Sequence, residues 1–189
     1  MARIHPAYPL DADELAELSP YERLDRQSQA ILAHRPEMAA GLTGLIASLL
    51  GGSGTLPMRL TELVRLRIAF WNQCRSCMSV RYDPDAISEE LVCSLERPEE
   101  SADLTAAEKS ALRFADLMAT DHLAIDDAVF DDLRRYFTEG EIVELSLHCA
   151  EYVGYGRMAA TWALHDHLHE SYRRAQDDAY TPWGEGALR

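Results

Sequence analysis

The residues of this chain best suited to chemistry are Cys74 and Cys77, in the segment Cys-Arg-Ser-Cys. At the start of a helix, unpaired N–H groups and the positive end of the dipole stabilise a thiolate, lowering its pKa from about 8.5 into a reactive range. The spacing also lets one sulfur resolve a sulfenic acid or a mixed disulfide formed on the other. The pair therefore favours thiol redox chemistry, and the pattern leaves open which cysteine attacks first.

Two other interpretations of the pair stay open. The cysteines could be small apolar residues on a core helix. They could also bind zinc, which needs a full tetrahedral set of ligands, but the spacing of Cys93, His148 and Cys149 matches no common zinc pattern. We therefore expect no metal and no cofactor, and we expect Cys93 and Cys149 to be buried small side chains.

Two charged residues flank the pair. Glu62 lies twelve residues before Cys74 in an apolar segment, where a carboxylate needs a partner or a role. Arg81 lies four residues after Cys77. A guanidinium can lower the pKa of a thiol but cannot accept its proton, so Arg81 either activates the pair or faces solvent without a role. The candidate catalytic residues are Cys74, Cys77, Glu62 and Arg81.

Histidines offer further candidate bases. His148 could face the cysteine pair from a late helix, or it could be a satisfied core residue. Of His165, His167 and His169, the first and last share a helix face, where a metal would need another ligand. We expect that face to be solvated or to lie in an interface.

The elements that must position these residues are helices. Capping-box patterns at Ser19–Glu22, Thr105–Glu108 and Thr138–Glu141 predict three helix starts. The segment from Leu60 to Phe70 is apolar on most sides, which is typical of a central helix, and the last helix is predicted to continue to about Tyr172. We predict an all-α bundle of about eight helices over residues 19–172, after an N-terminal arm (1–18) and before a tail (173–189).

Composition excludes several partners. Across 189 residues, 18 Lys+Arg against 32 Asp+Glu give a net charge of −14, which argues against nucleic acids and anionic membranes. The longest apolar-rich run, Leu42 to Leu50, is far shorter than the roughly 20 residues of a membrane span. The first residues lack the apolar run of a secretory signal, so a cytoplasmic location is expected.

The chain resembles the alkylhydroperoxidase D and carboxymuconolactone decarboxylase-like family. The likeness runs from about residue 20 to residue 168, and it is carried by Glu62, the run Leu63-Val64-Arg65-Leu66-Arg67, Asn72, Cys74, Cys77 and the segments 104–116 and 137–145. The resemblance implies an all-α homo-oligomer with thiol-dependent peroxidase or disulfide-exchange activity, in which a Glu and a His relay protons. Glu62 matches that Glu, Arg81 stands at the His position, and Ser76 stands where some members carry a second His.

Three functions are consistent with these residues. The leading hypothesis is a thiol-dependent oxidoreductase that reduces a hydroperoxide or a disulfide, with a protein or small dithiol as reductant. The alternatives are a lyase acting on a small lactone or carboxylic acid, for which Arg67 or Arg81 would hold the carboxylate, and a non-catalytic oligomeric protein.

Overall fold

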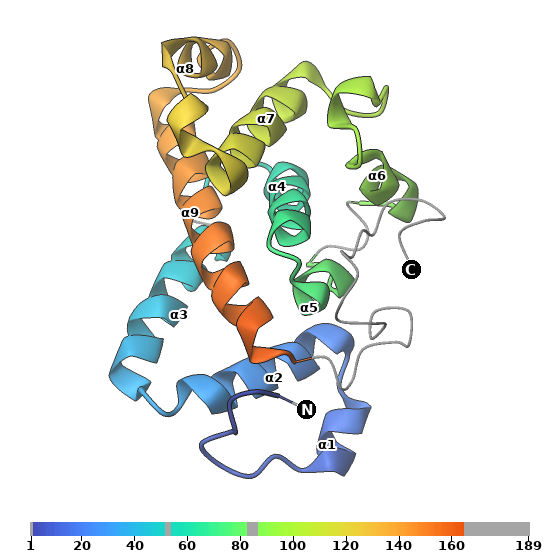
Figure 1. Cartoon of the computed structure of the whole chain (residues 1–189), viewed down its shortest axis with the longest axis vertical. Coiled ribbons are helices and arrows are strands. Elements are labelled where there is room, and N and C mark those ends of the chain that lie inside the picture. The colour runs from blue at the N-terminus through green and yellow to red at the C-terminus, as the bar shows by residue number, and fades with distance from the viewer. Residues whose placement is uncertain (1, 52–53, 83–86, 165–189) are drawn as a thin grey trace.

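The computed structural model of the chain describes residues 2–51, 54–82 and 87–164. Within these ranges every regular element is helical, which confirms the all-α prediction (Figure 1). The elements are α1 (Ala12–Glu17), α2 (Pro20–Leu32), α3 (Pro36–Leu50), α4 (Met58–Trp71), α5 (Arg75–Ser79), α6 (Glu89–Ser94), α7 (Ala106–Thr120), α8 (Asp127–Leu133) and α9 (Glu139–Trp162), with short 3-10 turns at Pro98–Glu100 and His122–Ala124.

Helix α4 lies at the centre, with α7 and α9 packed against it (Figure 1). Every residue from Leu60 to Ala69 is buried, and most of the apolar ones belong to the main core cluster. The predicted central helix is thereby confirmed. Because α5 follows α4 after a short turn, the cysteine pair is attached directly to this core.

All three predicted capping boxes are present. They begin α2, α7 and α9, and pair Ser19 with Glu22, Thr105 with Glu108, and Thr138 with Glu141. Glu108 also accepts a hydrogen bond from Arg59 Nε at 2.7 Å. The start of α7 is therefore tied to α4 by the same carboxylate that caps the helix.

The end of α4 is held against α9 by Asn72. Its Nδ2 donates to the Tyr152 carbonyl at 2.8 Å, and its Oδ1 accepts from Arg157 Nε at 3.0 Å. A Cβ atom on Gly156 would lie 2.5 Å from the Asn72 Nδ2, so glycine is what permits this approach. These contacts fix the segment that leads to Cys74 relative to α9.

The prediction that the last helix continues to about Tyr172 is wrong. Helix α9 ends at Trp162, because Ala163 adopts a left-handed conformation (φ 56°) and turns the chain. Leu164 is then buried beside Ile31 of α2, and its carbonyl accepts a hydrogen bond from Ser76 Oγ at 2.8 Å. Residues 165–172 and the predicted tail, 173–189, lie outside the described residues.

The N-terminal arm contains the short helix α1, and its backbone is tied to α9 and α2: the Arg3 N–H donates to the Trp162 carbonyl, and the Ala7 N–H to the Ala30 carbonyl. Helix α3 has an apolar sequence, yet none of its residues is buried, and Met38 and Leu45 are exposed. Among the described helices, none combines the length and apolarity needed to cross a membrane.

Candidate active site

Cys74 and Cys77 form a disulfide at the start of α5. Cys74 is the N-cap residue, and its sulfur accepts a hydrogen bond from the Cys77 backbone N–H at 3.3 Å. Cys74 is buried, whereas Cys77 is partly exposed. The two sulfurs are thus close enough to bond, and one of them can be reached from outside the core.

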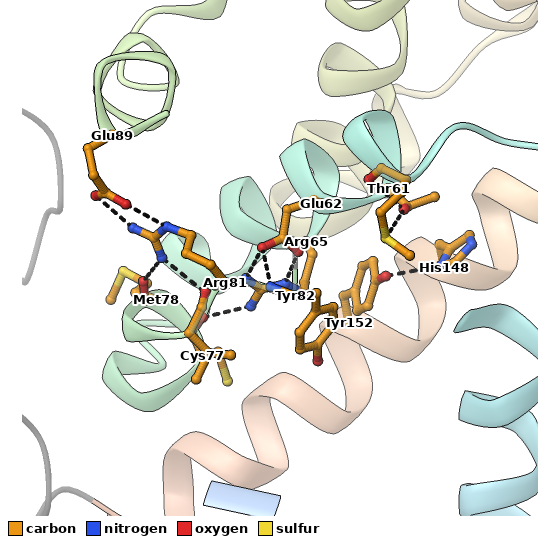
Figure 2. A network of polar contacts seen from close by, with 12 residues as sticks. Thr61, Glu62, Arg65, Cys77, Met78, Arg81, Tyr82, Glu89, His148 and Tyr152 are labelled. Carbon is orange, nitrogen blue, oxygen red and sulfur yellow. Dashed lines mark hydrogen bonds and ion pairs between the residues drawn. The ribbon is translucent and has the colours of Figure 1, made fainter. Parts of the chain in front are cut away.

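Glu62 forms a buried ion pair with Arg65 of the same helix. Arg65 Nε donates to Glu62 Oε2 at 2.6 Å, and Arg65 Nη2 donates to Oε1 at 2.8 Å. The backbone N–H of Tyr82 adds a third hydrogen bond to Oε1, at 3.0 Å. Both carboxylate oxygens are therefore occupied, and the structure links Glu62 to the cysteines through Arg65 (Figure 2).

Arg65 connects this pair to the end of α5. Its Nη1 donates to the Cys77 carbonyl and its Nη2 to the Val80 carbonyl, both at 2.7 Å, and the guanidinium stacks 4.3 Å from the Tyr82 ring (Figure 2). Burial opposes the charge on Arg65, but the hydrogen bonds and charge of Glu62 outweigh it and raise the pKa of Arg65. Arg65 therefore stays charged and anchors α5 to α4.

Arg81 is directed toward α6. It donates to both Glu89 oxygens, at 2.9 and 3.0 Å, and to the carbonyls of Met78 and Val80 at 2.6 and 2.9 Å. In Figure 2, Arg81 and Glu89 lie on one side of Cys77, and Glu62 and Tyr82 lie on the other. The charge of Arg81 is thus balanced by Glu89. Arg81 therefore does not face solvent without partners, which was the other alternative for this residue.

Cys77 lines a pocket between α2, α4, α9 and the segment that follows α5. The pocket is mainly apolar, and four tyrosines contribute to its wall: Tyr21, Tyr82, Tyr152 and Tyr155. It adjoins a groove of about 450 Å³ between α2, α3 and α9, which shares the same tyrosines. Cys74, Glu62 and Arg81 are not among the lining residues, so Cys77 is the sulfur that a molecule in the pocket would meet.

Glu151 of α9 lines both the pocket and the groove. Burial raises the pKa of this carboxyl to about 7, although the nearby charge of Arg65 partly opposes the shift. A carboxyl with such a pKa exchanges its proton near neutral pH, as a general acid or base must. Glu151 is therefore the carboxyl of the described lining whose pKa lies near neutral pH.

Several other predicted residues lie away from the pocket. His148 is buried, and its Nδ1 lies 3.1 Å from the Tyr152 hydroxyl, on the far side of that ring from Cys77 in Figure 2. Arg67 donates to Asp116 at 2.6 and 2.9 Å and to the Leu95 carbonyl. His165, His167 and His169 lie outside the described residues.

The two remaining cysteines differ. Cys149 is buried as predicted, and burial raises the pKa of its thiol. The prediction for Cys93 is wrong, because Cys93 is exposed near the end of the short helix α6. Within the described ranges, no three His, Cys, Asp or Glu side chains gather as a metal ion would require.

Arg65 and Glu151 are the site residues that the sequence interpretation missed. Arg65 follows Glu62 by one helical turn in an apolar helix, and that spacing is itself a signal for an ion pair. Glu151 is an acidic residue between Cys149 and Tyr152, on a helix whose neighbouring positions are largely apolar. Only the packing of α4 and α5 against α9 places it in the lining of the same pocket as Cys77.

Comparison of the sequence with known proteins finds limited likeness. No family model matches the chain. Two uncharacterized proteins of Mycobacterium tuberculosis, from strains CDC 1551 and H37Rv, are each 41% identical to it over 92 residues. That match covers 46% of this chain and 31% of each relative, so the chain matches only about a third of their length.

Solved structures are more informative about the fold. The alkylhydroperoxidase AhpD core protein of Ralstonia eutropha, an uncharacterized peroxidase-related protein, has a TM-score of 0.60 and 22% identity, covering 82% of this chain and 89% of that one. An uncharacterized peroxidase-related protein of Silicibacter has a TM-score of 0.61 and 20% identity, and the match covers 86% of this chain and 93% of that one. The debrominase Bmp8 has a TM-score of 0.63 and 19% identity, and the match covers 85% of this chain and 91% of that one. It was solved as a cysteine-to-alanine variant in complex with 2,3,4-tribromopyrrole. The chain therefore has the alkylhydroperoxidase AhpD-like fold, which confirms at the level of the fold the resemblance predicted from its sequence.

Proposed function

We propose that this chain is a thiol-dependent oxidoreductase that reduces a small hydroperoxide through Cys74 and Cys77. The observation that carries the proposal is the bonded pair at the start of α5, with one sulfur in the wall of a pocket and the other buried behind it. The AhpD-like fold supports the same chemistry. Disulfide exchange with a partner is the second reaction open to the same pair.

Cys77 is the attacking residue in this proposal, because it lines the pocket. Its thiolate attacks the terminal oxygen of the hydroperoxide, the O–O bond breaks, and an alcohol and a Cys77 sulfenic acid form. The Cys74 thiol then gives up its proton and attacks the Cys77 sulfur, and the leaving hydroxide takes up that proton, so water is released and the disulfide forms. An external dithiol reduces the disulfide and returns both cysteines to thiols.

The surrounding residues hold this arrangement. The Cys77 backbone N–H donates to the Cys74 sulfur at 3.3 Å and holds that sulfur beside Cys77, where it can resolve the sulfenic acid. Glu62 acts as a positioning residue through Arg65, and Arg81 supports the other side of α5 through the Met78 and Val80 carbonyls. A homo-oligomeric state and a cytoplasmic location stay predictions.

The first test is steady-state turnover. Wild-type protein is expected to consume cumene hydroperoxide in the presence of a dithiol, and the double variant Cys74→Ser/Cys77→Ser is expected to consume none above buffer. Cys93→Ser serves as the matched control, because it removes an exposed thiol that lies outside the pocket. Turnover that survives in the double variant would contradict the proposal.

A second candidate uses the same thiols on a halogenated ring. Four tyrosine rings in the pocket wall suit an aromatic ligand, and the fold is shared with a debrominase that holds a tribromopyrrole. Bromide release from that compound with a dithiol present would favour this candidate.

The lyase alternative lacks comparable support in the described pocket. It needs a cation free to hold a carboxylate, but Arg65, the cation in the described lining, is committed to Glu62 and to two carbonyls. Arg67 and Arg81 bind other partners.

A further inference from the structure

We propose that Glu151 is the acid–base residue of the Cys77 pocket, taking the proton of the thiol and delivering it to the leaving oxygen of the hydroperoxide. The inference rests on the proposed function and deepens it. It assigns to α9 a task that the resemblance places on the residue at position 81, where this chain has an arginine.

The residues that line the pocket are the first support for this proposal. Glu151 and Cys77 both line it, although they come from α9 and α5, which pack against each other. Among the described lining residues Glu151 is the one carboxyl, and no histidine is present. Glu151 also borders the wider groove, so it stands where the pocket and groove meet.

The other titratable groups near the pocket cannot take the proton. Arg65 stays charged, and burial raises the pKa of Tyr82 to about 12. Burial also raises the pKa of Tyr152 and Tyr155 on α9 and of Tyr21 on α2, so these hydroxyls stay protonated at neutral pH. Asp25 of α2 borders the groove but does not line the pocket.

The residues named from the sequence as candidate proton carriers are occupied elsewhere. Both Glu62 oxygens accept hydrogen bonds from Arg65. His148 lies behind Tyr152 and is not among the described lining residues. Burial, partly opposed by Glu144, lowers the pKa of His148, which keeps its ring neutral at pH 7.

In this step one proton passes from Cys77 to Glu151 and then to the leaving oxygen. Ionised Glu151 accepts the proton of the Cys77 thiol, and the resulting thiolate attacks the hydroperoxide. When the O–O bond breaks, the organic oxygen leaves as an alkoxide, and the carboxylic acid of Glu151 returns the proton to it, giving the alcohol. The hydroperoxide is reduced, Cys77 is oxidised to the sulfenic acid, and Glu151 is again a carboxylate.

The test compares Glu151→Gln with wild type across pH. Glutamine keeps the shape of the side chain but cannot accept the proton, so hydroperoxide reduction is expected to fall at least about 100-fold at pH 7.5. The wild-type rate should rise with pH as Glu151 ionises, with a component centred near its pKa of about 7, and this component should vanish in the variant. Asp25→Asn is the matched control, since it removes a carboxyl from the neighbouring groove, and its rate and pH profile should match wild type.

Glu151→Asp provides a second measurement. It keeps a carboxyl one methylene shorter, and it should restore part of the rate together with the pH-dependent component, which a purely structural role of Glu151 would not require. If wild type is active and Glu151→Gln shows the same rate and the same pH profile, this inference is overturned while the proposed function stands. No hydroperoxide turnover in wild type would instead overturn the proposed function on which it rests.

Discussion

Replacing Arg65 by methionine is expected to lower the free energy of unfolding by about 3–5 kcal/mol, the largest stability effect that the site predicts. The variant leaves the Glu62 carboxylate buried without its cation, and it removes the donors to the Cys77 and Val80 carbonyls. Urea denaturation of both proteins measures the difference.

A control variant separates the effect of breaking the buried ion pair from the effect of losing any arginine. Arg134→Met breaks an exposed pair with Asp131 and Glu139, and it should lower the free energy of unfolding far less than Arg65→Met does, because water screens that pair. A loss for Arg65→Met no larger than that for Arg134→Met would contradict the anchoring role of the buried pair.

Single cysteine replacements are expected to give two different products. Cys77→Ser should react with no hydroperoxide, since the sulfur in the pocket is gone. Cys74→Ser should consume about one equivalent and then stop, with a sulfenic acid on Cys77 that no second thiol resolves. Dimedone labelling followed by mass spectrometry locates the oxidised residue.

The opposite labelling pattern has a clear meaning. A sulfenic acid on Cys74 in the Cys77→Ser protein would show that the buried sulfur attacks first, against the order that burial and pocket lining support. Cys149→Ser is the control for a buried thiol outside the pocket, and its behaviour should match wild type.

Local signals in the sequence predicted much of the fold. The capping boxes at Thr105 and Thr138 depend on side chains within one helical turn, so their positions follow from the sequence alone. The end of α9 does not, because the left-handed turn at Ala163 is set by the burial of Leu164 against α2. The exposure of Cys93 depends in the same way on what the short helix α6 packs against.

Part of the site could also be predicted from short-range spacing in the sequence. The proximity of Cys74 and Cys77 follows from their spacing, and a partner for buried Glu62 could be sought one turn along its helix, at Arg65. The place of Glu151 could not, because more than seventy residues separate it from Cys77, and only the packing of α9 against α4 and α5 puts both residues in the lining of one pocket. The pairing of Arg81 with Glu89 likewise depends on where α6 lies.

The most direct test of a redox role for the cysteine pair is the stoichiometry of one turnover. Fully reduced protein, freed of reductant, is mixed with one equivalent of cumene hydroperoxide, and the remaining thiols are alkylated and mapped by mass spectrometry. We expect one Cys74–Cys77 disulfide for each hydroperoxide converted to alcohol, with Cys93 and Cys149 still alkylated as free thiols after denaturation. Hydroperoxide that persists while Cys74 and Cys77 stay reduced, or that is consumed without their oxidation, would contradict the proposed chemistry.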